Sequence, residues 1–205
     1  MDRIGIMGGT FNPVHMGHLM LAEAAREALS LDEVWFVPTG YSYMKGAGNA
    51  SENMPLPEER LEMTGLAVQD NARFRCVDIE VRRGGATYTY ETLEELRENY
   101  PEKKFFFLIG ADCLYTIENW REPGRIFDAC ELVAAVRQGA SADAMQEKIA
   151  QLKERFGARI TLLPFRNLEI SSTEIRACVR EGRSIRYMTP RPVISYIEEK
   201  GFYRE

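Results

Sequence analysis

The sequence lacks any long run of apolar residues. Its longest runs, such as 105–109 and 132–136, have about five residues, whereas a helix that spans a bilayer needs about 20. The N-terminal segment MDRIGIMGGT has an acidic residue at position 2 and two glycines, where a signal peptide needs an unbroken apolar stretch. We therefore expect no membrane association and a cytoplasmic location.

Cysteine and histidine are scarce. The 4 cysteines are far apart in the sequence, with no CxxC pair, and they are Cys76, Cys113, Cys130 and Cys178. Buried free thiols are therefore expected, ahead of a disulfide framework or a metal site. The chain has only 2 histidines, and both fall within one stretch of four residues. Such clustering favours a shared function over a scattered structural role.

The chain also lacks an excess of positive charge. Its 26 Lys and Arg stand against 31 Asp and Glu, a formal net charge of −5, so we expect no nucleic-acid partner. Hydrophobic residues make up 45% and charged residues 28%, which excludes collagen-like, coiled-coil and disordered classes. The length of 205 residues predicts a single domain over 1–205, with a small C-terminal helical part from about 165 to 205.

Short β-rich segments alternate with amphipathic helical ones along the chain. The predicted strands are 3–7, 33–38, 74–81, 104–110, 131–136 and 159–163. The predicted helices include one through Leu19–Leu29, one from Pro57, then 89–100, 112–120, 141–156, 171–182 and one after Pro192. Residues 39–56 predict a long loop. This alternation predicts an α/β fold with a doubly wound parallel sheet and helices on both of its faces.

The segment GGTFNPVHMGHL, residues 8–19, carries the strongest functional signal. It begins where the first strand ends, which is where an α/β sheet places its ligand. Gly8 and Gly9 allow an anionic group to approach the backbone, and the N-terminus of the next helix offers unpaired N–H groups. His15 and His18 project to one side of the first helical turn. Neither GxGxxG nor GxxxxGK[ST] is present, and a zinc pair would lack a third ligand nearby.

This segment resembles the GxFxPxHxGH signature of the nucleotidyltransferase superfamily, and its GGTF variant looks like the bacterial nicotinate-nucleotide adenylyltransferases. Further segments resemble that family in the same order, namely VPTGYSYMK, TYTYETLEEL, FLIGADCL, ISSTEIR and PRPVISYIEEKGFY. The resemblance covers nearly the whole chain and implies a Rossmann-like fold. Two departures stand out: Asn12 replaces the family's usual Asp, and Ser42-Tyr43-Met44 replaces Pro-Pro-His.

The resemblance implies that a phosphate oxygen of nicotinate mononucleotide attacks the α-phosphorus of ATP, giving deamido-NAD and pyrophosphate. A phosphate monoester is largely dianionic at pH 7, with a second pKa of about 6, so the reaction needs no general base. The protein must hold two polyanions in line and stabilise the developing charge. His15, His18 and Thr10 would donate to phosphate oxygens. Mg²⁺ would arrive with ATP rather than in a dedicated protein site.

The other predicted site residues follow from the same resemblance. For ATP and its phosphates they are Gly8, Gly9, Phe11, Lys45, Gly110, Asp112, Arg137, Ser172, Thr173 and Arg176. For nicotinate they are Tyr88 and Thr89 at the carboxylate and Trp120 on the pyridine ring. The structural alternatives are a capping box at 171–174, helix N-caps at Thr89 and Asp112, a core position for Trp120, and solvated positions for Lys45 and Arg137.

Three other functions stay open. A phosphopantetheine adenylyltransferase typically has a shorter chain and lacks the TYTxxTL and YIEEKGFY segments. An enzyme that prefers nicotinamide mononucleotide differs in one substituent of its substrate. A non-catalytic nucleotide-binding module on the same fold is the alternative from another class, and the intact histidine motif argues against it. The sequence does not set the oligomeric state, a homo-oligomer included.

Overall fold

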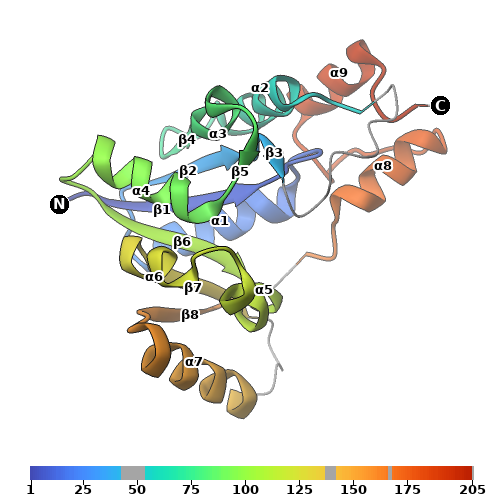
Figure 1. The fold of residues 1–205 in the computed structure, drawn as a ribbon. Coiled ribbons are helices and arrows are strands. Elements are labelled where there is room, and N and C mark those ends of the chain that lie inside the picture. Colours follow the sequence, from blue (N-terminus) through green and yellow to red (C-terminus); the bar gives the residue numbers. More distant parts are fainter. Residues whose placement is uncertain (43–53, 137–141, 166–167, 205) are drawn as a thin grey trace. The chain divides into compact units, whose positions relative to one another are not determined.

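The computed structural model describes residues 1–42, 54–136, 142–165 and 168–204, so the predicted site residues Lys45 and Arg137 lie outside it. Its strands are β1 (Arg3–Gly9), β2 (Glu33–Pro38), β3 (Tyr41–Ser42), β4 (Phe74–Cys76), β5 (Ala86–Thr87), β6 (Lys104–Gly110), β7 (Glu131–Val136) and β8 (Ile160–Pro164). Its helices are α1 (Met16–Ala28), α2 (Pro57–Val68), α3 (Ile79–Arg83), α4 (Thr89–Asn99), α5 (Ala111–Thr116), the 3-10 helix η2 (Ile117–Asn119), α6 (Pro123–Ala129), α7 (Ala142–Phe156), α8 (Ser172–Arg180) and α9 (Arg191–Lys200) (Figure 1).

The main sheet has six strands in the order β4-β2-β1-β6-β7-β8, and β3 with β5 forms a separate two-stranded sheet. β6 pairs in parallel with β1 and with β7, and β7 pairs in parallel with β8. From β1 the chain builds outward to β4 and then returns to place β6 on the other side of β1. This reversal of strand order is the doubly wound arrangement, and the predicted α/β fold is confirmed.

Contacts within the chain define two compact units. Unit 1 comprises Met1–Met7, Leu21–Val34 and Tyr88–Asn167, and unit 2 comprises Gly8–Met20, Trp35–Thr87 and Leu168–Glu205. In unit 1, every side chain from Phe105 to Ile109 is at most 6% exposed, so β6 is the strand covered on both faces that its apolar sequence predicts. In unit 2, α2 packs against β4 and α9.

The predicted helix over 141–156 is observed as α7. Met145, Ile149 and Leu152 lie on one face and are at most 5% exposed. Phe156 stacks on Phe127 of α6, with ring centroids 5.4 Å apart. Gly157, with a φ of 64°, ends the helix in the left-handed conformation.

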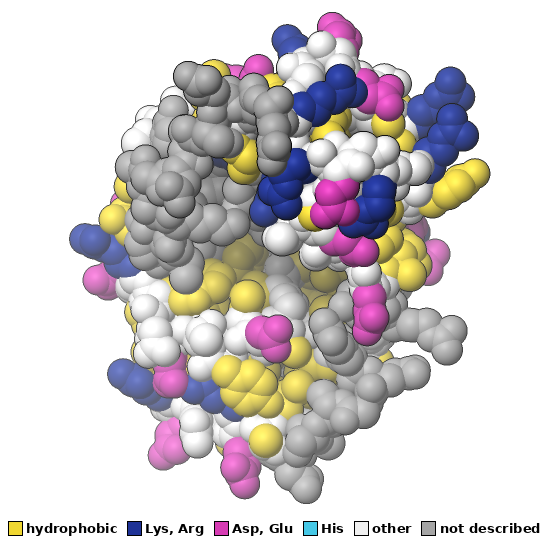
Figure 2. Space-filling model, turned by 90° about the vertical axis from the view of Figure 1, so that its right-hand side faces the viewer, with side chains coloured by type: hydrophobic (Ala, Val, Ile, Leu, Met, Phe, Trp, Pro, Cys, Tyr) yellow, Lys and Arg dark blue, Asp and Glu magenta, His cyan; other side chains and the backbone are white. Residues whose placement is uncertain are grey.

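The surface carries charges of both signs. On the face drawn in Figure 2, Lys and Arg side chains are interspersed with Asp and Glu side chains rather than gathered into one basic patch. This agrees with the formal net charge of −5. A bilayer-crossing helix is absent from the described ranges, since none of their helices combines the required length with the required apolar character.

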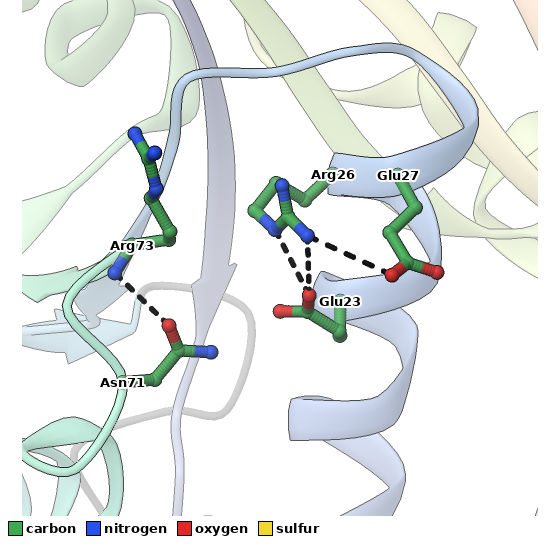
Figure 3. Close-up of polar contacts among 5 residues, drawn as sticks. All are labelled: Glu23, Arg26, Glu27, Asn71 and Arg73. Carbon is green, nitrogen blue, oxygen red and sulfur yellow. Dashed lines mark hydrogen bonds and ion pairs between the residues drawn. The ribbon is translucent and has the colours of Figure 1, made fainter.

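The charges on α1 suit its dipole. Its first turn has no acidic residue, and Arg26 in its last turn pairs with Glu23 at 2.6 Å and with Glu27 at 3.7 Å (Figure 3). The N-terminal end of α1 therefore keeps its positive character. Figure 3 also shows Asn71 Oδ1 accepting the backbone N–H of Arg73 at 2.9 Å, in the turn before β4.

The strand predicted over 74–81 is wrong beyond Cys76. The backbone N–H of Val77 still donates to Phe36 O at 2.9 Å, but α3 begins at Ile79. Over so short a segment, the apolar residues of CVDIEV fit a strand or one helical turn equally well. The loop expected over 39–56 also contains a strand, because β3 pairs with β5.

Candidate active site

Residues 8–18 run from the end of β1 through the connecting loop into the first turn of α1, and they bring the two histidines together in unit 2; we call this segment the histidine loop. The rings of His15 and His18 stack with centroids 3.7 Å apart and planes 29° apart. The backbone N–H of His15 donates to His18 Nδ1 at 3.2 Å. Because that nitrogen accepts, the neutral ring of His18 carries its proton on Nε2, where it is a donor.

Burial keeps both imidazoles neutral at pH 7. It lowers the pKa of His15 to about 4, and burial together with the nearby His15 lowers the pKa of His18 to about 3. His15 is 8% exposed, and its Nδ1 has no hydrogen-bond partner within the described residues. Buried polar atoms are nearly always paired, so this nitrogen fits a bound group that completes the bond.

Small and aromatic residues shape the histidine loop. Phe11 has a φ of 46° and is 2% exposed, and its ring lies edge-on to His18 with centroids 5.0 Å apart. A Cβ on Gly9 would lie 3.0 Å from the Phe11 ring, and one on Gly17 would lie 3.1 Å from His15 Nδ1. The two glycines therefore leave room for these rings. The Phe11 side chain packs in the core, so its backbone is the part left for the predicted ligand role.

Side chains from later segments hold the backbone carbonyls of the histidine loop. Two of the donors are guanidinium groups: Arg60 Nη1 donates to Thr10 O at 2.7 Å, and Arg176 Nη1 donates to Asn12 O at 2.8 Å. The other two are hydroxyl groups: Ser172 Oγ donates to Pro13 O and Thr189 Oγ1 donates to Val14 O, each at 2.8 Å. A carbonyl oxygen repels a phosphate, so a loop with its carbonyls engaged by donors can offer N–H groups and imidazoles to an anion. The sequence did not predict Arg60 or Thr189 in this role.

The first turn of α8 is fixed against the histidine loop. Ser171 Oγ accepts the backbone N–H of Glu174 at 3.1 Å, which is the predicted N-cap bond. Ser172 donates its only hydroxyl proton to the loop, so it has its backbone N–H left for a phosphate. Thr173 Oγ1 accepts from Arg176 Nη2 at 3.2 Å and keeps its own hydroxyl proton. The structure thus brings Ser172, Thr173 and Arg176 to the loop that carries the histidines.

Gly110 and Asp112 lie at the carboxyl end of β6, in unit 1. Gly110 is the N-cap of α5, and Asp112 is exposed in its first turn, so the N-cap reading of Asp112 is wrong. A Cβ on Gly110 would meet nothing within 4 Å. Packing therefore does not require glycine there, which suits close approach of a ligand. Thr89 is not an N-cap either, because α4 begins one residue after its extended N-cap, Tyr88.

Aromatic residues and an arginine form the remaining candidate cluster in unit 1. Trp120 is half-buried against the edge of Phe107, with ring centroids 6.4 Å apart, and its Nε1 has no partner within the described ranges. The guanidinium of Arg121 lies 4.8 Å from the ring centroid of Tyr88, with Nη1 3.4 Å from the Tyr88 hydroxyl. Arg121 was not predicted as a site residue, although it directly follows Trp120.

A cavity of about 680 Å³ lies elsewhere in unit 2, between α8 and α9. Several arginines and isoleucines line it, among them Arg180, Arg183, Arg186, Ile194 and Ile197. It contains none of the predicted site residues. Among the described residues, no three His, Cys, Asp or Glu side chains lie close enough to hold a metal ion.

The fold and the histidine loop define a class of protein, the nucleotidyltransferases. The model of the family described as cytidylyltransferase-like matches residues 6–178. A relative from Lachnoclostridium phytofermentans, named "Probable nicotinate-nucleotide adenylyltransferase", is 43% identical over 99% of this chain and 100% of its own. One of the same name from Exiguobacterium sibiricum is 42% identical over 98% of each chain. The chain therefore belongs to the nicotinate-nucleotide adenylyltransferase family.

Solved structures of this class share the fold. The Plasmodium falciparum nicotinic acid mononucleotide adenylyltransferase complexed with NaAD is 20% identical and superposes with a TM-score of 0.78, covering 99% of this chain and 98% of its own. The same enzyme complexed with APC gives a TM-score of 0.76. The likeness over the whole chain shows that the fold is Rossmann-like.

Proposed function

We propose that the protein transfers the adenylyl group of ATP to nicotinate mononucleotide, forming deamido-NAD and pyrophosphate in NAD biosynthesis. The phosphate of the mononucleotide attacks the α-phosphorus in line, and the bond from that phosphorus to the bridging oxygen of pyrophosphate breaks. The observation that carries the proposal is the stacked, neutral pair of His15 and His18 at the N-terminus of α1. Relatives at about 40% identity over the whole chain carry the same activity in their names.

The histidine loop suits the stabilisation of charge on the phosphates. His18 Nε2–H is a fixed donor because its Nδ1 is engaged, and Thr10 adds a hydroxyl. Thr173 and Arg176, held on the first turn of α8, would bind the phosphates that leave as pyrophosphate. Donors placed in advance cost no reorganisation when charge develops, and one of them is worth about 10²–10³ in rate.

The cluster of Trp120, Tyr88, Thr89 and Arg121 suits the nicotinate group. The indole of Trp120 would stack on the pyridine ring, and the Nε1–H without a partner can donate to the substrate. Arg121, held beside Tyr88, places a positive charge near the residues proposed for the carboxylate. A carboxylate gains charge-assisted hydrogen bonds from such donors that an amide does not, so we propose that the acid is the preferred substrate.

ATP would enter as its Mg²⁺ complex, and the ion would neutralise part of the phosphate charge. No dedicated cage of acidic residues is required for an ion that the substrate carries. Asp112, exposed beside Gly110, would accept hydrogen bonds from the ribose hydroxyls.

Pyrophosphate release tests the proposed function. The purified protein with Mg²⁺ and ATP is supplied in turn with nicotinate mononucleotide, nicotinamide mononucleotide and phosphopantetheine. We expect release to be fastest with nicotinate mononucleotide. Faster release with either of the other two substrates would assign that activity instead, and no release with any of them would leave a nucleotide-binding module.

A further inference from the structure

A polar cluster with two buried members contacts the histidine loop within unit 2. It consists of Arg60 of α2, Arg176 of α8, and Tyr203, which follows α9. Arg60 is 5% exposed and Tyr203 is 6% exposed. A buried guanidinium is costly unless hydrogen bonds compensate for its lost hydration. The partners of Arg60 and Tyr203 therefore indicate what these residues are for.

Arg60 connects two loops. Its Nη1 donates to Thr10 O of the histidine loop at 2.7 Å, and its Nη2 donates to Gly40 O, just after β2, at 2.8 Å. The backbone at Gly40 packs closely against α3, because a Cβ there would lie 2.7 Å from the backbone oxygen of Glu80. One planar guanidinium thus sets the spacing of two backbone segments. A lysine has the charge but not the rigid fork that reaches both carbonyls.

Tyr203 fixes the side chain of Asn12 in the histidine loop. The tyrosine hydroxyl donates to Asn12 Oδ1 at 2.6 Å, and burial raises the pKa of Tyr203 far above its ordinary value of 10.0, so it stays a donor. With Oδ1 facing the tyrosine, the Nδ2 group of Asn12 faces the other way. This NH₂ group has no partner within the described residues, so it is a neutral donor at the position where the resemblance led us to expect an Asp carboxylate.

The backbone at the C-terminus is shaped to deliver this hydroxyl. Tyr203 has a φ of 64°, in the left-handed region that non-glycine residues seldom adopt, and it follows Gly201, which has a φ of 69° and caps α9. Such a conformation persists only where the surroundings favour it enough to outweigh its cost. Here the favourable surroundings are the burial of the ring and the bond to Asn12.

We infer that Arg60 and Tyr203 are positioning residues for adenylyl transfer: Arg60 holds the Thr10 carbonyl and Tyr203 orients the Asn12 amide, so that the histidine loop presents donors to the phosphates. The inference rests on the proposed function and extends it to residues that touch neither substrate. It also makes the last turn of the chain a functional part of the site, although Tyr203 is 191 residues from Asn12 in sequence.

The first test is Tyr203→Phe, which removes one hydroxyl and keeps the buried ring. We expect kcat to fall about tenfold, while the KM for nicotinate mononucleotide changes less than about twofold, because the Asn12 amide loses its orientation. The matched control is Tyr196→Phe in α9, whose ring packs on Phe202 with centroids 5.9 Å apart and lies outside the loop contacts. This control should turn over like the wild type. Thermal melting of both variants separates a loss of rate from unfolding.

A double-mutant cycle distinguishes positioning from a general structural role. If the Tyr203 hydroxyl acts through the Asn12 amide, Asn12→Ala should lower kcat by a similar factor, and the double variant should lose no more than either single variant. If the two losses multiply instead, the inference is wrong for Tyr203.

Arg60→Lys tests the other positioning residue, because lysine keeps the charge and loses the fork. It should lower kcat about tenfold; a wild-type kcat would remove Arg60 from the inference.

Binding of inorganic pyrophosphate, measured by calorimetry, tests the histidine loop without turnover. We expect Tyr203→Phe to weaken binding about threefold and Tyr196→Phe to leave it unchanged. If the wild type binds pyrophosphate but does not turn over ATP with nicotinate mononucleotide, the proposed function fails while this comparison still decides the positioning role. If the wild type turns over, the positioning role is wrong when Tyr203→Phe has both wild-type pyrophosphate binding and a wild-type kcat. If the wild type does not turn over, wild-type pyrophosphate binding in Tyr203→Phe is enough to show that the role is wrong.

Discussion

At the scale of single residues, the proposed chemistry depends most on His18. Its Nε2–H acts on charge that develops as pyrophosphate leaves, so its loss should raise the barrier more than it weakens substrate binding. We expect His18→Ala to lower kcat at least about 100-fold with a modest change in melting temperature, measured by pyrophosphate release and thermal melting. His18→Gln, which keeps an N–H donor, should retain more activity. A wild-type kcat in His18→Ala would contradict the assignment.

Trp120 should affect only one of the two substrates. Stacking of an aromatic side chain on a base is worth about 1–3 kcal/mol, or roughly 5- to 150-fold. Trp120→Ala should therefore raise the KM for nicotinate mononucleotide within that range and leave the KM for ATP nearly unchanged, in steady-state assays. Trp120→Phe should recover part of the loss. An increase confined to the KM for ATP would refute the stacking role.

Sequence reasoning proposed site residues whose motif is local, and it did not point to Arg60 or Tyr203, which would act from a distance. GGTFNPVHMGHL is contiguous, so the clustering of both histidines is visible in the sequence, and the family resemblance of this segment implies their role. The arginine at position 60 could have been noticed, because it lies on the buried face of α2 together with Met63, Thr64 and Ala67. Tyr203 gave no such signal, since only the folded chain brings its hydroxyl to Asn12.

At the scale of elements, the start of α1 has a steric requirement that acts directly on a histidine ring. A Cβ on Gly17 would lie 3.1 Å from Nδ1 and 3.2 Å from Cε1 of His15, so the ring must shift away from its stacked position. We expect Gly17→Ala to lower kcat about tenfold or more, in the same pyrophosphate assay. The control is Gly65→Ala in α2, where nothing lies within 4 Å of the added Cβ.

The two alanine substitutions should differ in kcat, because only Gly17→Ala displaces the His15 ring. Gly65→Ala should be neutral or stabilise the protein by up to about 1 kcal/mol, since alanine favours a helix interior. Gly17→Ala gains the same helical preference but displaces a proposed catalytic ring. If both variants have wild-type kcat, the position of the His15 ring does not matter for the rate.

Some strands with a continuous apolar pattern were predicted to the residue, and the shortest elements were not predicted. The strands 104–110 and 131–136 have the predicted limits because each is a buried apolar run that is bounded by polar residues or glycine. β3 and β5 have two residues each, too few to carry a period. α6 was missed because its seven residues PGRIFDA begin with a proline and a glycine that suggest a loop.

At the scale of the whole molecule, the alternation of strands and helices was enough to predict the doubly wound sheet. To predict the order of its strands, one also needs the rule that the strand order reverses at a switch point, here between β1 and β6. The single-domain organisation over 1–205 stays a prediction.

The pH dependence of stability belongs to this scale too, because it sums the protons bound by every group in the folded and unfolded chain.

The two buried histidines should make the protein less stable in mild acid. Their ordinary pKa is 6.5, and burial lowers it to about 4 for His15 and about 3 for His18. Between pH 6.5 and about 4, the unfolded chain therefore binds protons that the folded chain does not. The free energy of unfolding should fall as the pH falls through this window, by at most about 1.4 kcal/mol per pH unit for each histidine.

Melting temperatures measured from pH 7 to pH 5 test this prediction. Asp2, Glu118 and Glu131 have lowered pKa values, so their contribution to stability is present above their ordinary values of 3.8 and 4.5 and is lost only below them. A decline in melting temperature above pH 5 would therefore come mainly from the histidines. The double variant His15→Gln/His18→Gln should decline much less over the same range. If the wild-type melting temperature stayed constant or rose on acidification, the folded chain would be taking up the protons, and the histidines would meet phosphate as imidazolium rather than as the neutral donors inferred from their burial.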